Sequence, residues 1–114
     1  MKSPITTHVL DLSLGRPAPG ITVRLERRRS DSAMELLAQG ATNADGRVSD
    51  LLPPGAVETG TYRITFELES YFKSGARKSF YPEASIVFVV ESTTEHYHVP
   101  LLLSPFGYST YRGS

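Results

Sequence analysis

The sequence predicts an all-β protein, a sandwich of antiparallel sheets. Residues 21–26 and 62–68 alternate apolar and polar side chains with a period of two, which is typical of strands with one buried face. About eight short strands separated by regular turns are typical of a β-sandwich. A chain of 114 residues suits a single core, so residues 1–114 are expected to form one domain.

Six other strand candidates join these two in chain order, separated by turn residues. We expect them at residues 5–10, 21–26, 36–42, 48–52, 62–68, 85–91, 96–103 and 109–112. Proline, glycine, asparagine and serine predict turns at residues 17–20, 43–46, 53–55 and 104–107. Only residues 70–78 are predicted to be helical, and Gly75 keeps that helix short.

One predicted strand is apolar on both of its faces. Residues 86–90 read Ile-Val-Phe-Val-Val, whereas a sandwich strand needs only one apolar face. We expect the second face to contact another subunit. The alternative is that it is covered by the aromatic segment that contains Tyr71, Phe72, Phe80 and Tyr81.

Composition excludes several classes of function. Twelve basic residues balance twelve acidic ones, so a nucleic-acid or acidic-membrane partner is not expected. The absence of cysteine excludes disulfides, thiolate metal sites and cysteine nucleophiles. The longest apolar run is too short to span a membrane. Residues 1–7 lack the apolar core of a signal peptide, so we expect a cytoplasmic protein, or a periplasmic one if a leader has been removed.

Strand parity directs all three histidines away from the core. If the aromatic and aliphatic face of residues 97–103 is buried, His96 and His98 lie on the outer face, and His8 does so by the same argument. They are then solvated surface residues or functional ones. A neutral imidazole suits a general base near neutral pH. A zinc site made by all three is the other chemistry, although a His-x-His pair is common by chance.

Two further positions carry candidate chemistry. In the turn Asp45-Gly46-Arg47, Gly46 supplies a positive φ and Asp45 can bond the turn backbone, which holds Arg47 either as a surface charge or as a fork for a carbonyl-rich or anionic ligand. Ser114 follows a predicted strand that contains Tyr111, so an ordered chain end is expected. The sequence has no nucleophile elbow, phosphate loop or dinucleotide fingerprint.

Four motifs together resemble one known family. They are Thr7-His8-Val9-Leu10-Asp11, Asn43-Ala44-Asp45-Gly46-Arg47, Tyr71-Phe72 with Phe80-Tyr81-Pro82, and the segment from His98 to the closing Tyr111-Arg112-Gly113-Ser114. The whole chain is similar to the transthyretin-like 5-hydroxyisourate hydrolases. The closing tetrapeptide is specific to the hydrolases and is lacking in the vertebrate hormone carrier transthyretin.

The resemblance implies a fold and an assembly. The expected fold is a sandwich of two four-stranded antiparallel sheets with one short helix. The expected assembly is a homotetramer, a dimer of dimers with active sites at the dimer–dimer interface.

The resemblance also implies an activity, hydrolysis of 5-hydroxyisourate to 2-oxo-4-hydroxy-4-carboxy-5-ureidoimidazoline in urate degradation, with neither metal nor organic cofactor. The implied catalytic residues are His8, Arg47, His98 and Ser114. The implied substrate-binding residues are His8, Arg47, Tyr111, Arg112, Gly113 and Ser114. Which histidine is the base stays open, and the alternative function is a small-ligand carrier without catalysis.

Overall fold

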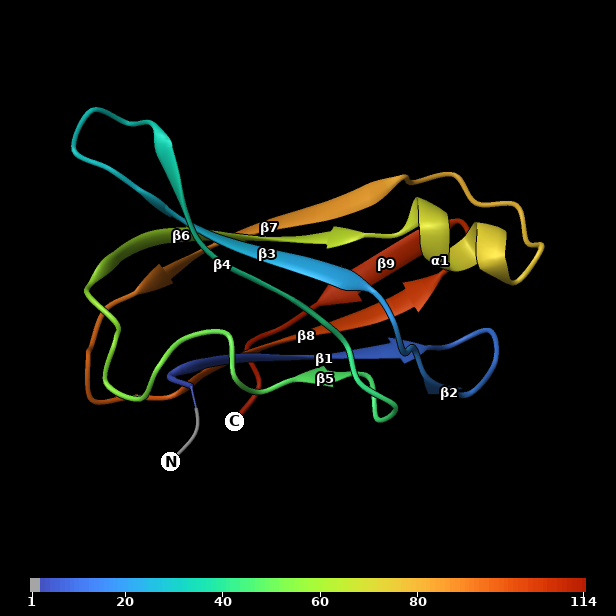
Figure 1. Cartoon of the computed structure of the whole chain (residues 1–114), viewed down its shortest axis with the longest axis horizontal. Helices are drawn as coiled ribbons and strands as arrows, with labels where there is room; N and C mark the ends of the chain where they lie inside the picture. The colour runs from blue at the N-terminus through green and yellow to red at the C-terminus, as the bar shows by residue number, and fades with distance from the viewer. Residues whose placement is uncertain (1–2) are drawn as a thin grey trace.

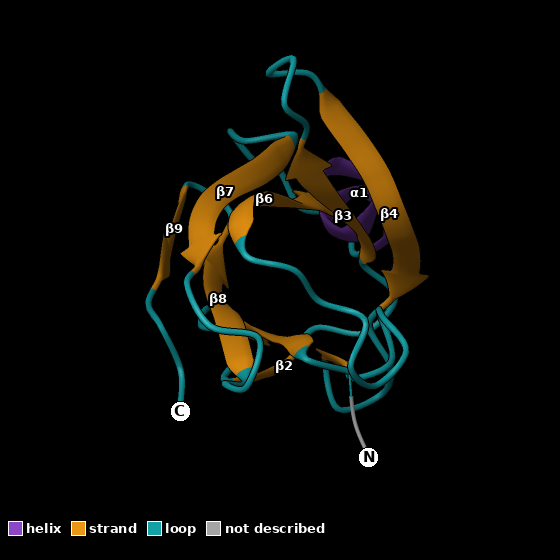
Figure 2. Cartoon of the chain, turned by 90° about the vertical axis from the view of Figure 1, so that its left-hand side faces the viewer, coloured by secondary structure: helices purple, strands orange, loops and turns teal. Residues whose placement is uncertain are grey.

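Two β-sheets pack face to face around one apolar core, as the alternation of residues predicted (Figures 1 and 2). The computed structural model describes residues 3–114. The first sheet contains β1 (Ile5–Asp11), β2 (Arg16–Pro17), β5 (Arg47–Val48), β8 (Tyr97–Ser104) and β9 (Gly107–Thr110). The second contains β3 (Thr22–Arg28), β4 (Met34–Ala41), β6 (Gly60–Glu67) and β7 (Glu83–Val90).

The first sheet differs from the expected one in two respects. It has five strands in place of four, because the two-residue strands β2 and β5 both pair with β1. In addition, β1 and β8 run parallel, from the pair Ile5 and Tyr97 to the pair Asp11 and Leu103. Parallel neighbours need a long connection, and here the entire second sheet provides it. Alternation of side chains reports which face is buried and contains no information about strand direction.

The core is built from the apolar faces of the long strands. Val23 and Leu25 of β3 and Ile64 and Phe66 of β6 are fully buried, which confirms the alternation that predicted these strands. The predicted strand at 48–52 is confirmed only at its start, since β5 ends at Val48.

No helix within residues 3–114 is long and apolar enough to cross a membrane.

The α-helix α1 (Glu69–Ser74) is anchored to the end of β1 by a buried carboxylate. Asp11 is fully buried and accepts hydrogen bonds from Arg77 and Tyr71, each at 2.7 Å, and from the Ser13 hydroxyl at 2.6 Å. Burial alone would raise the pKa of Asp11, but these hydrogen bonds outweigh it and hold the pKa well below its ordinary value. The helix is shorter than the predicted segment 70–78 because Gly75 ends it.

The strand predicted to be apolar on both faces is β7. Its core-facing side includes Ala84 and Val90, which are buried, while Val87 and Val89 are 56% and 55% exposed on the opposite side. The aromatic alternative does not apply to these two valines, because Tyr81 packs against Tyr108 of β9 and leaves them uncovered. The second apolar face of β7 is therefore open in the single chain.

Candidate functional site

The outer face of the first sheet gathers most of the predicted site residues. Thr6 of β1 lies opposite His98 of β8, and His8 of β1 lies opposite Arg47 of β5. Residues opposite each other on neighbouring strands project from the same face of a sheet. Their apolar neighbours along the strands are buried in the core instead: Val48, Tyr97 and Val99. The predicted parity of His8 and His98 is thus confirmed.

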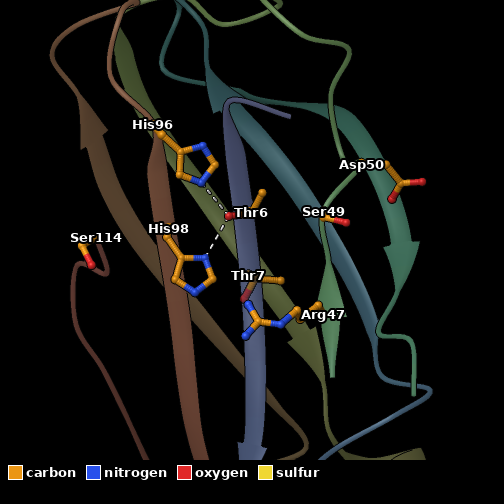
Figure 3. Close-up of a pocket in the computed structure, with 8 residues that line it drawn as sticks. All are labelled: Thr6, Thr7, Arg47, Ser49, Asp50, His96, His98 and Ser114. Carbon is orange, nitrogen blue, oxygen red and sulfur yellow. Dashed lines mark hydrogen bonds between the residues drawn. The ribbon is translucent and has the colours of Figure 1, made fainter. Parts of the chain in front are cut away.

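An open cleft of about 620 Å³ lies on this face, at the end of the sheet where β1 begins. Figure 3 shows His96 and His98 directed at β1, with the Arg47 side chain reaching back across β1 towards them. Eight residues line the cleft: Thr6, Thr7, Arg47, Ser49, Asp50, His96, His98 and Ser114. Three of the four predicted catalytic residues therefore meet in one cleft.

Thr6 connects the two histidines of the cleft. Its Oγ1 atom lies 2.8 Å from Nδ1 of His98 and 2.9 Å from Nε2 of His96, both hydrogen-bonding distances. Thr6 is almost completely buried, and His96 is exposed just before β8. The hydroxyl thus holds a ring nitrogen of His98 on the side of β1.

The chain end is fixed against His98 by Gly113. The Gly113 N–H donates a hydrogen bond of 2.8 Å to the His98 carbonyl, and the two residues form an isolated antiparallel bridge. A Cβ atom at Gly113 would lie 2.5 Å from Cδ2 of His98, far inside van der Waals contact. Only glycine lets the backbone lie this close to the imidazole, and the close approach brings Ser114 to the edge of the cleft.

Arg47 is positioned by the tight turn that precedes β5. Gly46 adopts a positive φ of 74°, as predicted, and a Cβ atom there would lie 2.4 Å from the Val9 carbonyl oxygen. The side chain that bonds the turn backbone is that of Asn43, which accepts from the N–H groups of Asp45 and Arg47. The prediction that Asp45 plays this part is wrong, because asparagine at the first position of the turn can reach both N–H groups.

His8 lies beside the cleft and is not among its lining residues. The imidazole is half-buried, and this burial lowers the pKa of His8 below its ordinary value of 6.5. The positive charge of Arg47 lowers it further, while the backbone and carboxylate of Asp45 act in the opposite direction. The net result is a neutral imidazole at neutral pH.

The remaining two residues of the closing tetrapeptide line a different cavity in the single chain. Tyr111 and Arg112 border an apolar cavity of about 340 Å³ that also contacts His98. The Arg112 guanidinium lies 4.6 Å from the centre of the Tyr97 ring and 3.2 Å from a Glu95 carboxylate oxygen. Their assignment as substrate-binding residues stays a prediction.

The geometry does not favour the alternative of a three-histidine zinc site. The rings of His96 and His98 converge on the hydroxyl of Thr6. Within residues 3–114, no group of three or more histidine, aspartate or glutamate side chains is placed to hold a metal ion.

Sequence reasoning missed Thr6 as a member of the site. Parity alone places it on the same face as His8, but a threonine on a strand carries no signal of its own. The pairing of β1 with β8 places it opposite His98, and that pairing joins residues 92 positions apart. Ser49 and Asp50 of the cleft were also missed, because they follow β5 in an irregular segment, where strand parity gives no information.

Comparison with known proteins gives one consistent family. A model of the HIUase/Transthyretin family matches residues 5–113. The chain is 46% identical to the 5-hydroxyisourate hydrolase of Mus musculus over 113 residues, covering 98% of this chain and 96% of the mouse protein.

Two solved structures share the fold. The 5-hydroxyisourate hydrolase of Klebsiella pneumoniae matches with a TM-score of 0.85 and 40% identity, covering 96% of this chain and 97% of that one. Sea bream transthyretin in complex with thyroxine matches with a TM-score of 0.92 and 28% identity, covering 97% of this chain and 95% of that one.

Proposed function

The chain belongs to the HIUase/Transthyretin family, and from this premise we propose that it hydrolyses 5-hydroxyisourate, a step of urate degradation, at the cleft on the outer face of its first sheet. The observation that carries the proposal is the meeting of His98, Arg47 and Ser114 in that cleft. These residues come from β8, β5 and the last residue of the sequence, and the packing of the core does not require them to lie together.

The reaction opens a cyclic amide with water. We assign the role of general base to His98, because it lines the cleft while His8 does not. Water loses a proton to the imidazole as its oxygen attacks the amide carbonyl carbon, which produces a tetrahedral oxyanion. The Arg47 guanidinium offsets this negative charge and orients the carbonyl groups of the planar substrate. The C–N bond then breaks, and the departing nitrogen takes up a proton.

The other predicted residues have supporting roles. His8 is neutral and lies opposite Arg47, which suits a hydrogen bond to the substrate or to the departing nitrogen. Ser114 contributes its hydroxyl at the edge of the cleft. No metal or organic cofactor is assigned a role in this mechanism.

A carrier without catalysis is the second candidate, and one observation favours it. The fold agrees more closely with thyroxine-bound sea bream transthyretin, at a TM-score of 0.92, than with the Klebsiella hydrolase, at 0.85. Fold alone does not determine function. The identities of 46% and 40% with the hydrolases, against 28% with that carrier, support the hydrolase.

We also propose that the active form is a homotetramer with its clefts covered at the interface between dimers. Two features support this: the cleft of the single chain is open to solvent, and β7 exposes Val87 and Val89. Covering the cleft with a second copy would exclude water from the charges that act on the substrate. A cytoplasmic location stays a prediction.

The decisive experiment is a spectroscopic assay on freshly generated 5-hydroxyisourate, with and without the protein. Wild-type protein should accelerate its disappearance. His98→Asn and Arg47→Ala should each lower kcat/KM by about 100-fold or more. Arg28→Ala, at the exposed end of β3 in the other sheet, is the control and should match the wild type. Thyroxine binding without any acceleration of hydrolysis would favour the carrier instead.

A further inference from the structure

We propose that Thr6 is a positioning residue that sets the tautomer of His98. His96 is the second hydrogen-bond partner of the Thr6 hydroxyl and takes up its proton. This inference deepens the proposed function and rests on it, because it assumes that His98 is the base. The observation behind it is the single hydroxyl that lies within hydrogen-bonding distance of Nδ1 of His98 and Nε2 of His96 (Figure 3).

A threonine hydroxyl has only one proton, and this couples the two rings. When both imidazoles are neutral, Thr6 can donate to only one of them, and the other ring must then donate to Thr6. If it donates to Nε2 of His96, it accepts from an N–H at Nδ1 of His98, and the lone pair of His98 then sits on Nε2. If it donates to Nδ1 of His98, the proton of that ring sits on Nε2, which can no longer accept one from water.

Only the first arrangement makes His98 a base through Nε2. In a neutral imidazole, one nitrogen carries the proton and the other the lone pair, so the partner of one nitrogen determines the chemistry of the other. The structure assigns Nδ1 to Thr6 at 2.8 Å. In this arrangement Nε2 of His96, 2.9 Å from the Thr6 hydroxyl oxygen, accepts the Thr6 proton and thereby keeps that proton away from His98.

The same three residues can store the proton that the reaction moves. Water gives one proton to Nε2 of His98, the Nδ1 proton of His98 passes to Thr6 Oγ1, and the Thr6 proton passes to Nε2 of His96. His98 is then neutral with a proton on Nε2, and His96 is the cation. When Nε2 of His98 gives its proton to the departing nitrogen, the two other transfers reverse, and every group returns to its first state.

Burial and exposure suit these separate roles. Thr6 is only 6% exposed, so its hydroxyl depends on protein partners for its hydrogen bonds. His96 is exposed, so water stabilises the positive charge when this ring is the cation. The buried hydroxyl of Thr6 can thus pass a proton to the solvated ring of His96, which holds it until the reaction needs it back.

The test measures the tautomer directly in the substrate-free protein. Long-range nitrogen–proton NMR correlations, recorded at a pH where the rings are neutral, distinguish a protonated from an unprotonated ring nitrogen. We expect wild-type His98 to carry its proton on Nδ1. Thr6→Val and His96→Ala should each shift His98 towards a mixture of both tautomers, whereas Thr6→Ser, which keeps the hydroxyl, should preserve the wild-type state.

Kinetics supply the second readout. Thr6→Val should lower kcat about tenfold with KM nearly unchanged, which is the size expected when one neutral hydrogen bond no longer selects a state. Thr6→Ser should restore kcat to within about twofold of the wild type. Thr22→Val on β3, in the other sheet, is the matched control for loss of a threonine hydroxyl and should leave kcat and the His98 tautomer unchanged.

Two results would overturn the inference. One is a wild-type His98 with its proton on Nε2, and the other is a folded Thr6→Val variant with the wild-type tautomer and rate. If Thr6→Val does not fold, the wild-type spectrum and the exposed-site variant His96→Ala still decide. If the wild-type protein does not hydrolyse 5-hydroxyisourate, the proposed function fails, while the NMR comparison still decides whether Thr6 couples the two rings.

Discussion

The contact between Gly113 and His98 gives the sharpest mutational prediction. A Cβ atom at Gly113 would lie 2.5 Å from Cδ2 of His98 and 3.2 Å from Cγ, whereas ordinary van der Waals contact begins at 3.4 Å. Gly113→Ala therefore requires a separation about 1 Å larger at Cδ2. Either the imidazole moves, or the chain end moves and takes Ser114 with it.

Both movements displace a group that the mechanism uses. A displacement of about 1 Å of a positioned catalytic group can cost about 100-fold in rate, so we expect Gly113→Ala to lower kcat/KM by that factor. The thermal midpoint should change by only a few degrees, because Gly113 lies outside the core.

The matched control is Gly107→Ala on β9. A Cβ atom there would lie 3.8 Å from the Ser104 hydroxyl oxygen, which is ordinary contact, and Gly107 has no positive φ. This variant should keep the wild-type kcat/KM in the 5-hydroxyisourate assay. A folded Gly113→Ala protein with full kcat/KM would refute the reasoning, because it would mean that the site tolerates a shift of the His98 ring or of the chain end.

Two further predictions concern the chain end and the buried carboxylate. Deleting Ser114, or adding a tag after it, should strongly lower turnover with little change in thermal stability, because deletion removes a side chain that lines the cleft and a tag displaces it. An N-terminal tag should be harmless, and equal initial rates in all these proteins would remove Ser114 from the site. Asp11→Asn should lower the free energy of unfolding by about 3 kcal/mol at pH 7, because it breaks the buried pair with Arg77. The pKa of Asp11 is depressed in the folded state, so its contribution to the free energy of unfolding is present above the unfolded pKa of about 3.9 and is lost progressively as the pH falls below it. Urea titrations from pH 7 to pH 2 should therefore show that the free energies of unfolding of the wild type and of Asp11→Asn converge.

The burial pattern of the fold could be predicted from the sequence, and the strand pairing could not. Period-two alternation located β3, β6 and β8 to within a few residues and assigned their buried faces, and an apolar run located β7. The parallel pairing of β1 with β8 depends on contacts between the two ends of the chain, about which local alternation says nothing. The two-residue strands β2 and β5 are too short for any alternation to appear.

Motifs and strand parity predicted part of the site. Parity placed His8 and His98 on the outer face, and the resemblance supplied Arg47 and Ser114. The cleft brings His98, Arg47 and Ser114 together and leaves His8 beside it. Thr6 was out of reach, because its importance comes from the partner opposite it on another strand and not from its own chemistry.

The division of each strand between two faces explains how one fold can serve a hydrolase and a carrier. On β1 and β8, alternate residues such as Val9 and Leu101 fill the core, while Thr6 and His98 project from the other side. Substitutions on the outer face leave the packing between the sheets intact. The backbone agrees with sea bream transthyretin at a TM-score of 0.92 although only 28% of residues are identical. Activity should therefore depend on outer-face residues whose replacement barely changes stability, and the variants at Thr6, His98 and Gly113 test this separation.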